Sequence, residues 1–329
     1  MNEAELSEMI IGESAAIRQV RSLILRLAPT GLPVLIQGPT GTGKELIAKA
    51  LHRASGRSGK CVTFNVCAIA ETMFEDALFG HVKGAFTGAH DNQLGFLSEA
   101  DAGTAFFDEI GELAYTLQPK LLRAIESHTY RPLGGNRDRT SEFRLISATN
   151  KHIPQLIEKG LFRQDLAARL STFIIDAPPL IARLEDIPVL VRHFVHSKRP
   201  GAEREISFGR DAIRALQQHN WPDNVRGLNN VVERVLVMSS GTVIRRSEVV
   251  DAIQQGKSYF LPQETGADTD RRKLVAALES TGWDTTSAAQ ILGKSRATIY
   301  RQMEKFGVHP RYRKSRTGTN ETISDDVNC

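Results

Sequence analysis

The sequence has little cysteine, few aromatic residues and no long hydrophobic run. Its three cysteines, Cys61, Cys67 and Cys329, match neither the spacing of metal ligands nor a disulfide framework. No stretch approaches the roughly 18 apolar residues of a membrane-spanning helix, and the acidic start MNEAELSEMI lacks the basic and apolar regions of a secretion signal. We therefore expect a cytoplasmic protein without membrane insertion.

Basic residues are concentrated near the C-terminus. The net charge of the chain is +4, but residues 271–316 hold eleven Lys or Arg against three Asp or Glu. A short basic segment of this kind is typical of a contact with nucleic acid. A solvated basic tail is the alternative.

Strand-like and helix-like segments alternate in the first part of the chain. Apolar runs at 33–38, 62–66, 104–109 and 143–149 read as strands, and 44–55 has helical spacing. This alternation predicts an α/β fold, a parallel sheet flanked by helices. The later segments 211–221 and 224–239 read as helices of a small lid. We expect domains at 1–180 (α/β), 181–253 (helical lid) and 270–313 (all-α), with a linker at 254–269 and a flexible tail at 314–329.

The segment GPTGTGKE (38–45) lies between an expected strand and an expected helix and matches G-x-x-x-x-G-K. Glycines let backbone N–H groups turn toward phosphate oxygens, the helix start adds positive potential, and the lysine reaches the outer phosphates. A glycine-rich strand–helix turn without a ligand is the alternative. We assign nucleotide binding to Gly38, Pro39, Thr40, Gly41, Thr42, Gly43, Lys44 and Glu45.

A second segment, GTAFFDEI (103–110), ends an apolar strand in two adjacent acids. Asp108 is placed to hold Mg²⁺, directly or through water, and Glu109 to orient or deprotonate the attacking water. Acids that favour the positive end of a helix dipole are the alternative. With the phosphate loop upstream, the pair indicates hydrolysis of ATP.

The segment GAFTGA (84–89) is too rich in glycine for a helix interior and too apolar at its centre for an ordinary solvated loop. Together with ELIAKALH, GTAFFDEIGEL, QPKLLRAIE, SATN, FRQDLAARL and WPDNVRGL, in this order, it resembles the bacterial enhancer-binding proteins. These are AAA+ ATPases that activate sigma-54 RNA polymerase. The resemblance covers roughly 10–250 and a C-terminal Fis-type helix-turn-helix.

The resemblance implies further roles at the nucleotide site. Asn65 matches the asparagine that holds the catalytic glutamate, and Thr149 and Asn150 match the sensor of the terminal phosphate. Ile11 and Gly12 match the motif on the adenine side.

Three arginines also take their roles from the resemblance. Arg226 matches the sensor II arginine, and Arg163 and Arg169 match a pair that acts in trans on the ATP of a neighbouring subunit. A guanidinium suits charge that develops on a transferring phosphate, whereas the residues alone favour a surface basic pair. The family forms hexameric rings, so we expect a homo-oligomer. The usual glycine and glutamate flanking NVR are here Asp223 and Gly227.

By the same resemblance the partner of the GAFTGA loop is the sigma-54 RNA polymerase holoenzyme. Phe86 and Thr87 would form the contact tip, since an aromatic ring is a rigid apolar anchor. A buried Phe anchor is the alternative. The contact residues are then Gly84, Ala85, Phe86, Thr87, Gly88 and Ala89.

Residues 284–308 fit a helix-turn-helix with a turn at Gly293. Ile291 is expected on the apolar face of the first helix, and Tyr300 is expected to pack inward from the second. A preceding helix at 270–280, with Leu274, Ala277 and Leu278, is expected to pair two subunits. The alternative is a helical hairpin used for oligomerisation. By resemblance the ligand is upstream enhancer DNA. The expected DNA-binding residues are Lys294, Ser295, Arg296, Thr298, Arg301, Gln302 and Lys305.

We expect the AAA+ segment to begin within about the first ten residues, which would leave no room for a receiver or other sensory domain before it. The chain resembles family members of this type, such as the phage-shock-protein activator and the type III secretion regulators. Control would then come from the abundance of the protein or from a separate partner, a trans-acting negative regulator or a homologous co-activator. Two rival functions stay open: an AAA+ regulator of sigma-70 polymerase, which the intact GAFTGA disfavours, and a different P-loop remodelling ATPase.

Overall fold

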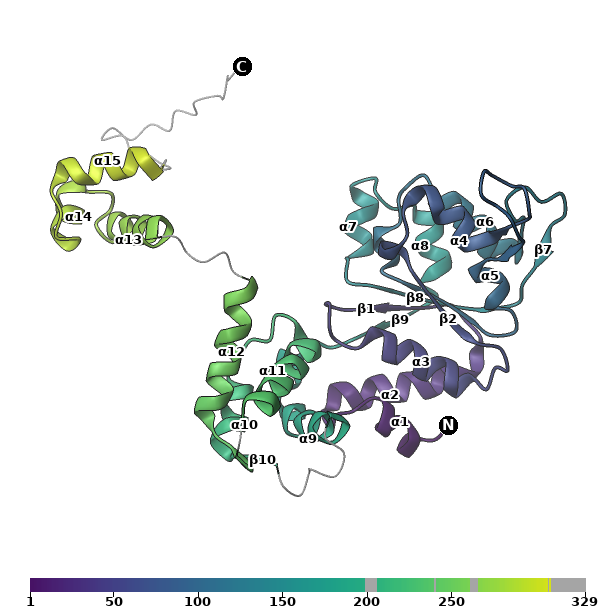
Figure 1. Ribbon diagram of the computed structural model, residues 1–329, viewed down its shortest axis with the longest axis horizontal. Helices are drawn as coiled ribbons and strands as arrows, with labels where there is room; N and C mark the ends of the chain where they lie inside the picture. Colours follow the sequence, from purple (N-terminus) through teal and green to yellow (C-terminus); the bar gives the residue numbers. More distant parts are fainter. Residues whose placement is uncertain (199–205, 240, 261–265, 307, 309–329) are drawn as a thin grey trace, which may run out of the picture. The chain divides into compact units, whose positions relative to one another are not determined.

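The computed structural model describes residues 1–198, 206–239, 241–260, 266–306 and 308 (Figure 1). The chain divides into two compact units, Met1–Ile253 and Gln254–Cys329. None of the helices in the described part of the chain is long and apolar enough to cross a membrane.

The first unit is built on a five-stranded parallel sheet, which confirms the expected α/β fold. The three central strands are buried because apolar side chains lie on both faces of the sheet. On β5, Phe106 contacts one core and Phe107 the other. In spatial order the strands are β2 (Cys61–Asn65), β5 (Thr104–Asp108), β8 (Arg144–Thr149), β1 (Val34–Gln37) and β9 (Phe173–Asp176).

Helices cover both faces of this sheet (Figure 1). The N-terminal helices pack on one face, where Asn2 and Ser14 cap the first two with their side-chain oxygens. The helices of that face are α1 (Glu3–Met9), α2 (Ala15–Leu27) and α3 (Lys44–Ser55). Those of the other face are α4 (Phe74–Phe79), α5 (Phe96–Glu99), α6 (Gln118–Ser127), α7 (Ile153–Glu158) and α8 (Gln164–Leu170).

Two short antiparallel strand pairs follow helices of the second face, one after α4 and one after α6. Strand β3 (Gly80–His81) pairs with β4 (Gln93–Leu94), and β6 (Thr129–Tyr130) pairs with β7 (Arg139–Thr140). The GAFTGA segment lies between β3 and β4.

A helical lid with its own core follows the sheet. Trp221 is buried in that core, and its indole N–H donates to Leu216 O. Its elements are a 3-10 segment (Leu180–Asp186), α9 (Ile187–Lys198), α10 (Arg210–Gln217), α11 (Asn224–Met238), the first part of α12 (Arg246–Phe260), and the paired strands β10 (Ser207–Phe208) and β11 (Val243–Ile244).

Besides the end of α12, the described residues of the second unit form α13 (Gly266–Ser280), α14 (Thr285–Ile291) and α15 (Arg296–Phe306). Leu274, Ala277 and Leu278 are buried with Ile299 inside this small core, so these three side chains do not form a surface that pairs two subunits, contrary to expectation. Ile291 and Tyr300 are 61% and 50% exposed, contrary to expectation. The small core is instead made by Leu274, Ala277, Leu278, Ala288, Ala289, Ile299 and Val308.

The expected linker at 254–269 is helical over much of its length. Helix α12 continues to Phe260 and α13 begins at Gly266, while 261–265 lie outside the described residues. Gly256 lies inside α12, where a single glycine costs only about 1 kcal/mol. The expected tail at 314–329 also lies outside the described residues.

Candidate nucleotide site, contact loop and DNA-binding surface

The phosphate loop joins β1 to α3, as the sequence predicts. Gly41 has φ +78, and a Cβ there would lie 2.3 Å from Asp223 O, so only glycine fits. Among the described residues, no protein acceptor takes the backbone N–H groups of 40–45. Six free N–H groups at a helix start form a site for phosphate oxygens, so the loop fits ATP.

A cavity of about 310 Å³ lies beside this loop. Eight residues that the sequence singled out line it: Thr40, Gly41, Gly43, Lys44, Glu45, Asp108, Glu109 and Arg226. Four others were not foreseen: Leu46, Phe194, Val225 and Asn229. Phe194 and Asn229 come from lid helices, and no motif marks them.

The two acids at the end of β5 have different environments. Asp108 is half-buried; burial raises the pKa of its carboxyl, and the N–H of Glu109, which donates to Oδ1 at 3.0 Å, opposes this. Glu109 has the left-handed backbone φ +52, and its Oε1 lies 3.8 Å from Lys44 Nζ. Its Oε2 accepts from Asn150 N at 3.3 Å. Glu109 therefore faces the phosphate side of the cavity.

A magnesium ion fits this cavity with one protein carboxylate. No cluster of three or more His, Cys, Asp or Glu side chains suited to a metal exists among the described residues. Mg²⁺ is usually held by one or two carboxylates together with phosphate oxygens and water. Asp108, which lines the cavity, is the residue that would supply this ligand.

The residues predicted to sense the terminal phosphate lie partly at the site and partly in the core. Asn150 Nδ2 donates to Thr40 Oγ1 at 3.0 Å, which ties the end of β8 to the phosphate loop. Thr149 is buried, and its Oγ1 accepts from Lys151 N. Asn65 Oδ1 accepts from Cys67 N at 2.9 Å, and the described contacts do not bring Asn65 to Glu109.

The N-terminal motif packs against the lid. Ile11 joins the hydrophobic core of the lid, and a Cβ on Gly12 would lie 2.8 Å from Asp186 Oδ2. Asp186 is buried and accepts from the N–H groups of Glu13 and Ser14. These contacts bring the N-terminal segment to the start of the lid.

Arg163 and Arg169 do not line the nucleotide cavity of their own chain. Arg163 lies on the surface and makes a bidentate contact with Asp165, with distances of 3.1 and 2.7 Å. The Asp165 carboxylate raises the pKa of the guanidinium. Arg169 is exposed in the last turn of α8. An open hollow of about 580 Å³ beside Arg163 includes Tyr115.

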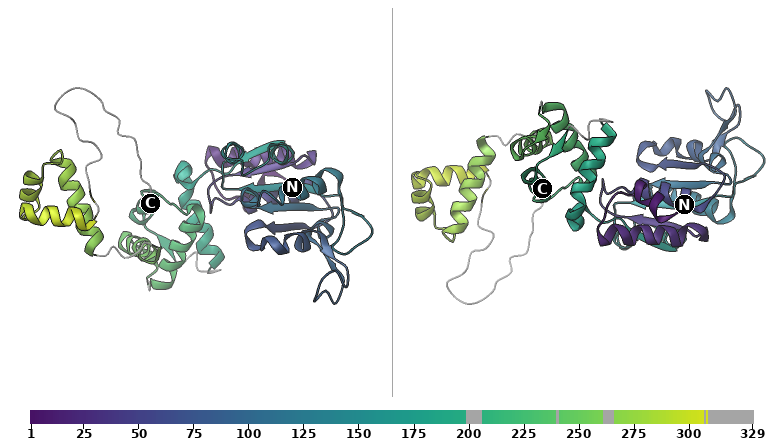
Figure 2. Two further views of the ribbon diagram at one scale, coloured as in Figure 1. Left: turned by 90° about the horizontal axis from the view of Figure 1, so that it is seen from above. Right: turned by 90° about the horizontal axis from the view of Figure 1, so that it is seen from below.

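The GAFTGA loop projects from the end of the α/β layers (Figure 2). Gly84 N donates to Ala89 O at 2.9 Å and closes the loop at its base, where Ala89 is buried. Phe86 is 42% exposed near the tip. On the neighbouring segment, Leu133 N donates to Gly80 O and Leu133 O accepts from Val82 N, so the two segments are paired through their backbones.

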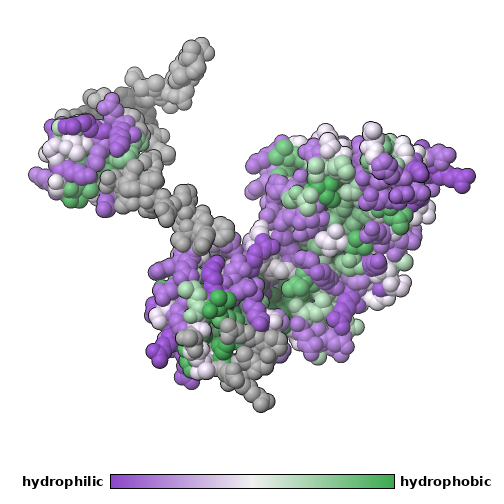
Figure 3. All heavy atoms as spheres, viewed as in Figure 1, coloured by the Kyte–Doolittle hydropathy of each residue, from purple (hydrophilic) through white to green (hydrophobic). Residues whose placement is uncertain are grey.

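The visible face of the second unit is mostly hydrophilic (Figure 3). Ser295 Oγ accepts from Thr298 N at 3.2 Å at the start of α15. Lys294 Nζ lies 3.4 Å from Gln302 Oε1, and Arg301 and Lys305 are exposed. These residues share one short helix and its approach, as a recognition helix requires.

Arg296 is held by Tyr300, which the sequence placed inside. The guanidinium donates to the Tyr300 hydroxyl at 3.3 Å and lies 5.6 Å from the ring centroid. Thr285 Oγ1 donates to the same hydroxyl at 3.4 Å. Tyr300 therefore links α14 to α15 on the surface.

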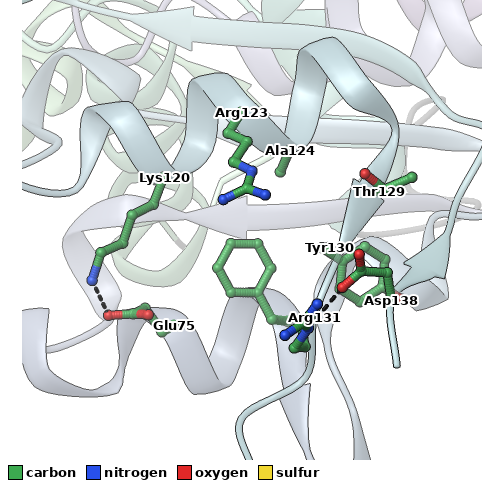
Figure 4. Close-up of a pocket in the computed structure, with 9 residues that line it drawn as sticks. Glu75, Lys120, Arg123, Ala124, Thr129, Tyr130, Arg131 and Asp138 are labelled. Carbon is green, nitrogen blue, oxygen red and sulfur yellow. Dashed lines mark hydrogen bonds and ion pairs between the residues drawn. The ribbon is translucent and has the colours of Figure 1, made fainter. Parts of the chain in front are cut away.

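A second cavity, of about 350 Å³, lies between α4 and α6 and beside β6 (Figure 4). Lys120 is paired there with Glu75, and Arg131 with Asp138. Arg123 points into it. None of the nucleotide-site residues lines this cavity, so the predicted chemistry does not reside there.

Comparison with known proteins assigns the chain to a family. A model described as the sigma-54 interaction domain matches residues 10–176, one described as the AAA+ ATPase lid domain matches 182–264, and one for bacterial regulatory proteins of the Fis family matches 267–306.

The similar proteins are transcriptional regulators. The chain is 39% identical over 311 residues to the Nif-specific regulatory protein of Azotobacter vinelandii, covering 92% of this chain and 60% of that protein. It is 40% identical over 304 residues to the transcriptional regulatory protein ZraR of Salmonella typhimurium, covering 90% and 68%. NtrX from Brucella abortus, crystallised in complex with ATP, matches with a TM-score of 0.67 at 31% identity, covering 93% of this chain and 72% of that chain. The chain therefore belongs to the family of sigma-54-dependent transcriptional activators, with an AAA+ domain and a Fis-type helix-turn-helix.

Proposed function

We propose that this protein hydrolyses ATP to remodel the closed complex of sigma-54 RNA polymerase and promoter DNA into the open complex. It binds enhancer DNA upstream through α13–α15 and acts as a homo-oligomeric ring, which by resemblance is a hexamer. The proposal rests chiefly on one observation. Five residues of the phosphate loop whose N–H groups have no protein acceptor line the same cavity as Glu109: Thr40, Gly41, Gly43, Lys44 and Glu45.

Each residue has a physical task in the proposed hydrolysis. The N–H groups and Lys44 hold the phosphates, and Asp108 supplies the protein ligand for Mg²⁺, which stabilises phosphate charge when bound. Glu109 orients the attacking water and takes its proton. Asn150 holds both Glu109 and Thr40, so it relates the position of the base to that of the phosphate loop.

The remaining charge stabilisation comes from a second subunit. Arg163 and Arg169 lie outside the cavity of their own chain and are exposed enough to reach a neighbour. A guanidinium supplied in trans can raise the rate on the order of 10³-fold or more. Arg163 must leave Asp165 to do so, and a surface pair of this kind is weak.

The GAFTGA loop is the proposed contact with sigma-54. Its exposed Phe86 is suited to anchor in a partner pocket. The rival function is regulation of sigma-70 polymerase, which the intact GAFTGA sequence disfavours. Control by a trans-acting regulator or co-activator is part of the same proposal.

The decisive experiment is open-complex formation in vitro. Sigma-54 holoenzyme, promoter DNA with upstream sites and the full chain are combined with ATP, with a non-hydrolysable analogue, or with neither. We expect heparin-resistant open complexes with ATP only. Equal yields without ATP, or activation of sigma-70 holoenzyme instead, would contradict the proposal.

A further inference from the structure

Every carbonyl group of the phosphate loop from residue 38 to 43 accepts a hydrogen bond. The loop and α3 satisfy three of them: Gly38 O accepts from Lys44 Nζ, Pro39 O from Thr42 Oγ1, and Gly43 O from Ile47 N. The other three, at the centre of the loop, accept only from the lid side.

The donors from the lid side are two side chains and two backbone groups. Asn224 Nδ2 donates to Thr40 O at 2.9 Å. The N–H groups of Val225 and Arg226 donate to Gly41 O at 3.0 and 3.3 Å. Arg183 Nη2 donates to Thr42 O at 3.1 Å.

These bonds fix the direction of the N–H groups that face the phosphates. In a planar trans peptide the C=O of one residue and the N–H of the next point to opposite sides. Holding the carbonyls of 40, 41 and 42 toward the lid therefore turns the N–H groups of 41, 42 and 43 the other way. These three are among the N–H groups without a protein acceptor.

The residues that supply the lid donors have features that lower the stability of the fold. Asn224 has φ +50, and nearby Trp221 has φ +48, a region that non-glycine residues rarely adopt. Arg183 is only 3% exposed, and its Nε has no hydrogen-bond partner. A buried guanidinium with an unsatisfied N–H destabilises a fold, and an apolar side chain of similar length would avoid the cost.

The side-chain oxygen of Asn224 is also held by a hydrogen bond. Its Oδ1 accepts from Leu180 N at 2.9 Å, at the point where the chain enters the lid. Asp223 beside it has φ −93, so the aspartate that replaces the family's glycine does not strain this turn.

We propose that Asn224 and Arg183 are positioning residues for nucleotide binding, which hold the phosphate-loop carbonyls so that the N–H groups of 41–43 face the phosphates. This inference rests on the proposed ATP function and names residues for it outside the phosphate loop and the acids. The affinity for a nucleotide that carries phosphates depends on these donors, whereas the affinity for adenosine does not.

Equilibrium binding to the full chain tests the inference. The variants are Arg183→Met and Asn224→Gly; glycine keeps the left-handed backbone at 224. Arg234→Met is the matched control, because the Arg234 guanidinium donates within the lid, to Ala252 O. The measured quantities are the Kd values of ADP and adenosine and the thermal midpoint of the nucleotide-free protein.

We expect each test variant to weaken ADP about tenfold, the effect of losing one hydrogen bond that positions others. Adenosine affinity should stay near that of the wild type in both variants, and so should the thermal midpoint of Arg183→Met. Asn224→Gly also loses the bond from Leu180 N, so its midpoint should fall. Arg183→Lys, which keeps a donor, should recover most of the ADP affinity. Arg234→Met should leave the ratio of ADP to adenosine affinity unchanged.

Unchanged ADP affinity in Arg183→Met and Asn224→Gly would overturn the inference. So would an equal loss of ADP and adenosine affinity together with a lower midpoint, because that pattern marks a purely structural role. Wild-type protein that binds no nucleotide would overturn the proposed function itself, whereas a wild type that binds and variants that bind equally overturn the inference alone.

Discussion

The ring of His81 lies edge-on against the ring of Phe86, with centroids 5.0 Å apart and planes at 68°. His81 is buried, and its Nδ1 lies 2.6 Å from Asp76 Oδ1. A histidine fixed by a carboxylate thus supports one side of an aromatic ring that is otherwise 42% exposed. Phe86 is held at the surface instead of folding inward, as a contact residue requires.

Phe86→Ala tests the contact directly. We expect ATPase turnover within about twofold of the wild type and a loss of transcription activation of about tenfold or more, the size expected for a central aromatic anchor. The measurements are phosphate release and open-complex yield on the same protein preparation. Met73→Ala, at another exposed apolar residue, is the control and should affect neither. Retained activation in Phe86→Ala means that the loop is not the contact.

Gly134→Ala tests whether the segment beside the loop supports it. Gly134 has φ +69, and a Cβ there would lie 2.7 Å from Ala85 Cβ. We expect the displaced loop to lose activation several-fold while ATP turnover is retained. Gly56→Ala is the matched control, with φ +68 and nothing within 4 Å. Equal effects of the two substitutions on activation would show that backbone strain, not the contact with Ala85, is responsible.

Mixing two inactive variants tests catalysis in trans. Glu109→Gln should bind ATP but lose turnover by at least ~100-fold, because the general base is missing. Arg163→Ala should also bind ATP and lose turnover. Mixed in equal amounts, they should regain part of the activity, since some interfaces then pair an intact Glu109 with an intact Arg163. A fully active Arg163→Ala protein would rule out the trans role.

The capping residue Asp284 gives the helix-turn-helix a pH dependence. Bonds from the Ser287 hydroxyl and from the N–H groups of Ser287 and Thr286 lower the pKa of its carboxyl below 3.8. A lowered folded-state pKa stabilises the fold above the unfolded-state value, and this contribution is lost as pH falls through the folded-state pKa. Asp284→Ala should therefore lower the thermal midpoint at neutral pH and have little effect in strong acid.

Asp284→Asn is the control for that titration, because asparagine caps a helix without titrating. Its midpoint, followed by circular dichroism against pH, should lack the acid transition assigned to Asp284. An identical acid transition in Asp284→Asn would assign the pH dependence to other carboxyl groups.

Much of the fold could be predicted because its strongest signals are local. The buried strand β5 reads as an apolar run, and the phosphate loop lies between such a run and a helix of clear period. The edge strand β9 escaped, since Phe173 and Ile174 are both exposed there and no alternation marks it. In the second unit, Tyr300 was placed inward because short helices leave the buried face poorly defined.

The parts of the site that lie in a local sequence motif could be predicted. The parts that depend on tertiary contacts could not. Asp108 and Glu109 can be recognised because they end an apolar strand. Lys44 can be recognised because it begins a helix after a glycine-rich loop. Asn224 and Arg183 reach the loop only because the lid folds back on it, across 184 and 141 residues of sequence. Spacing along the chain holds no signal for such contacts.

The backbone pairing of Leu133 with Gly80 and Val82 has a mechanical consequence. Two hydrogen bonds on either side of one residue join the loop that carries Phe86 to a second, separate loop. The first loop therefore cannot move at its base unless the second moves with it or these main-chain bonds break. Substituting side chains in either loop leaves these main-chain bonds available. It can therefore change the contact surface without separating the two loops.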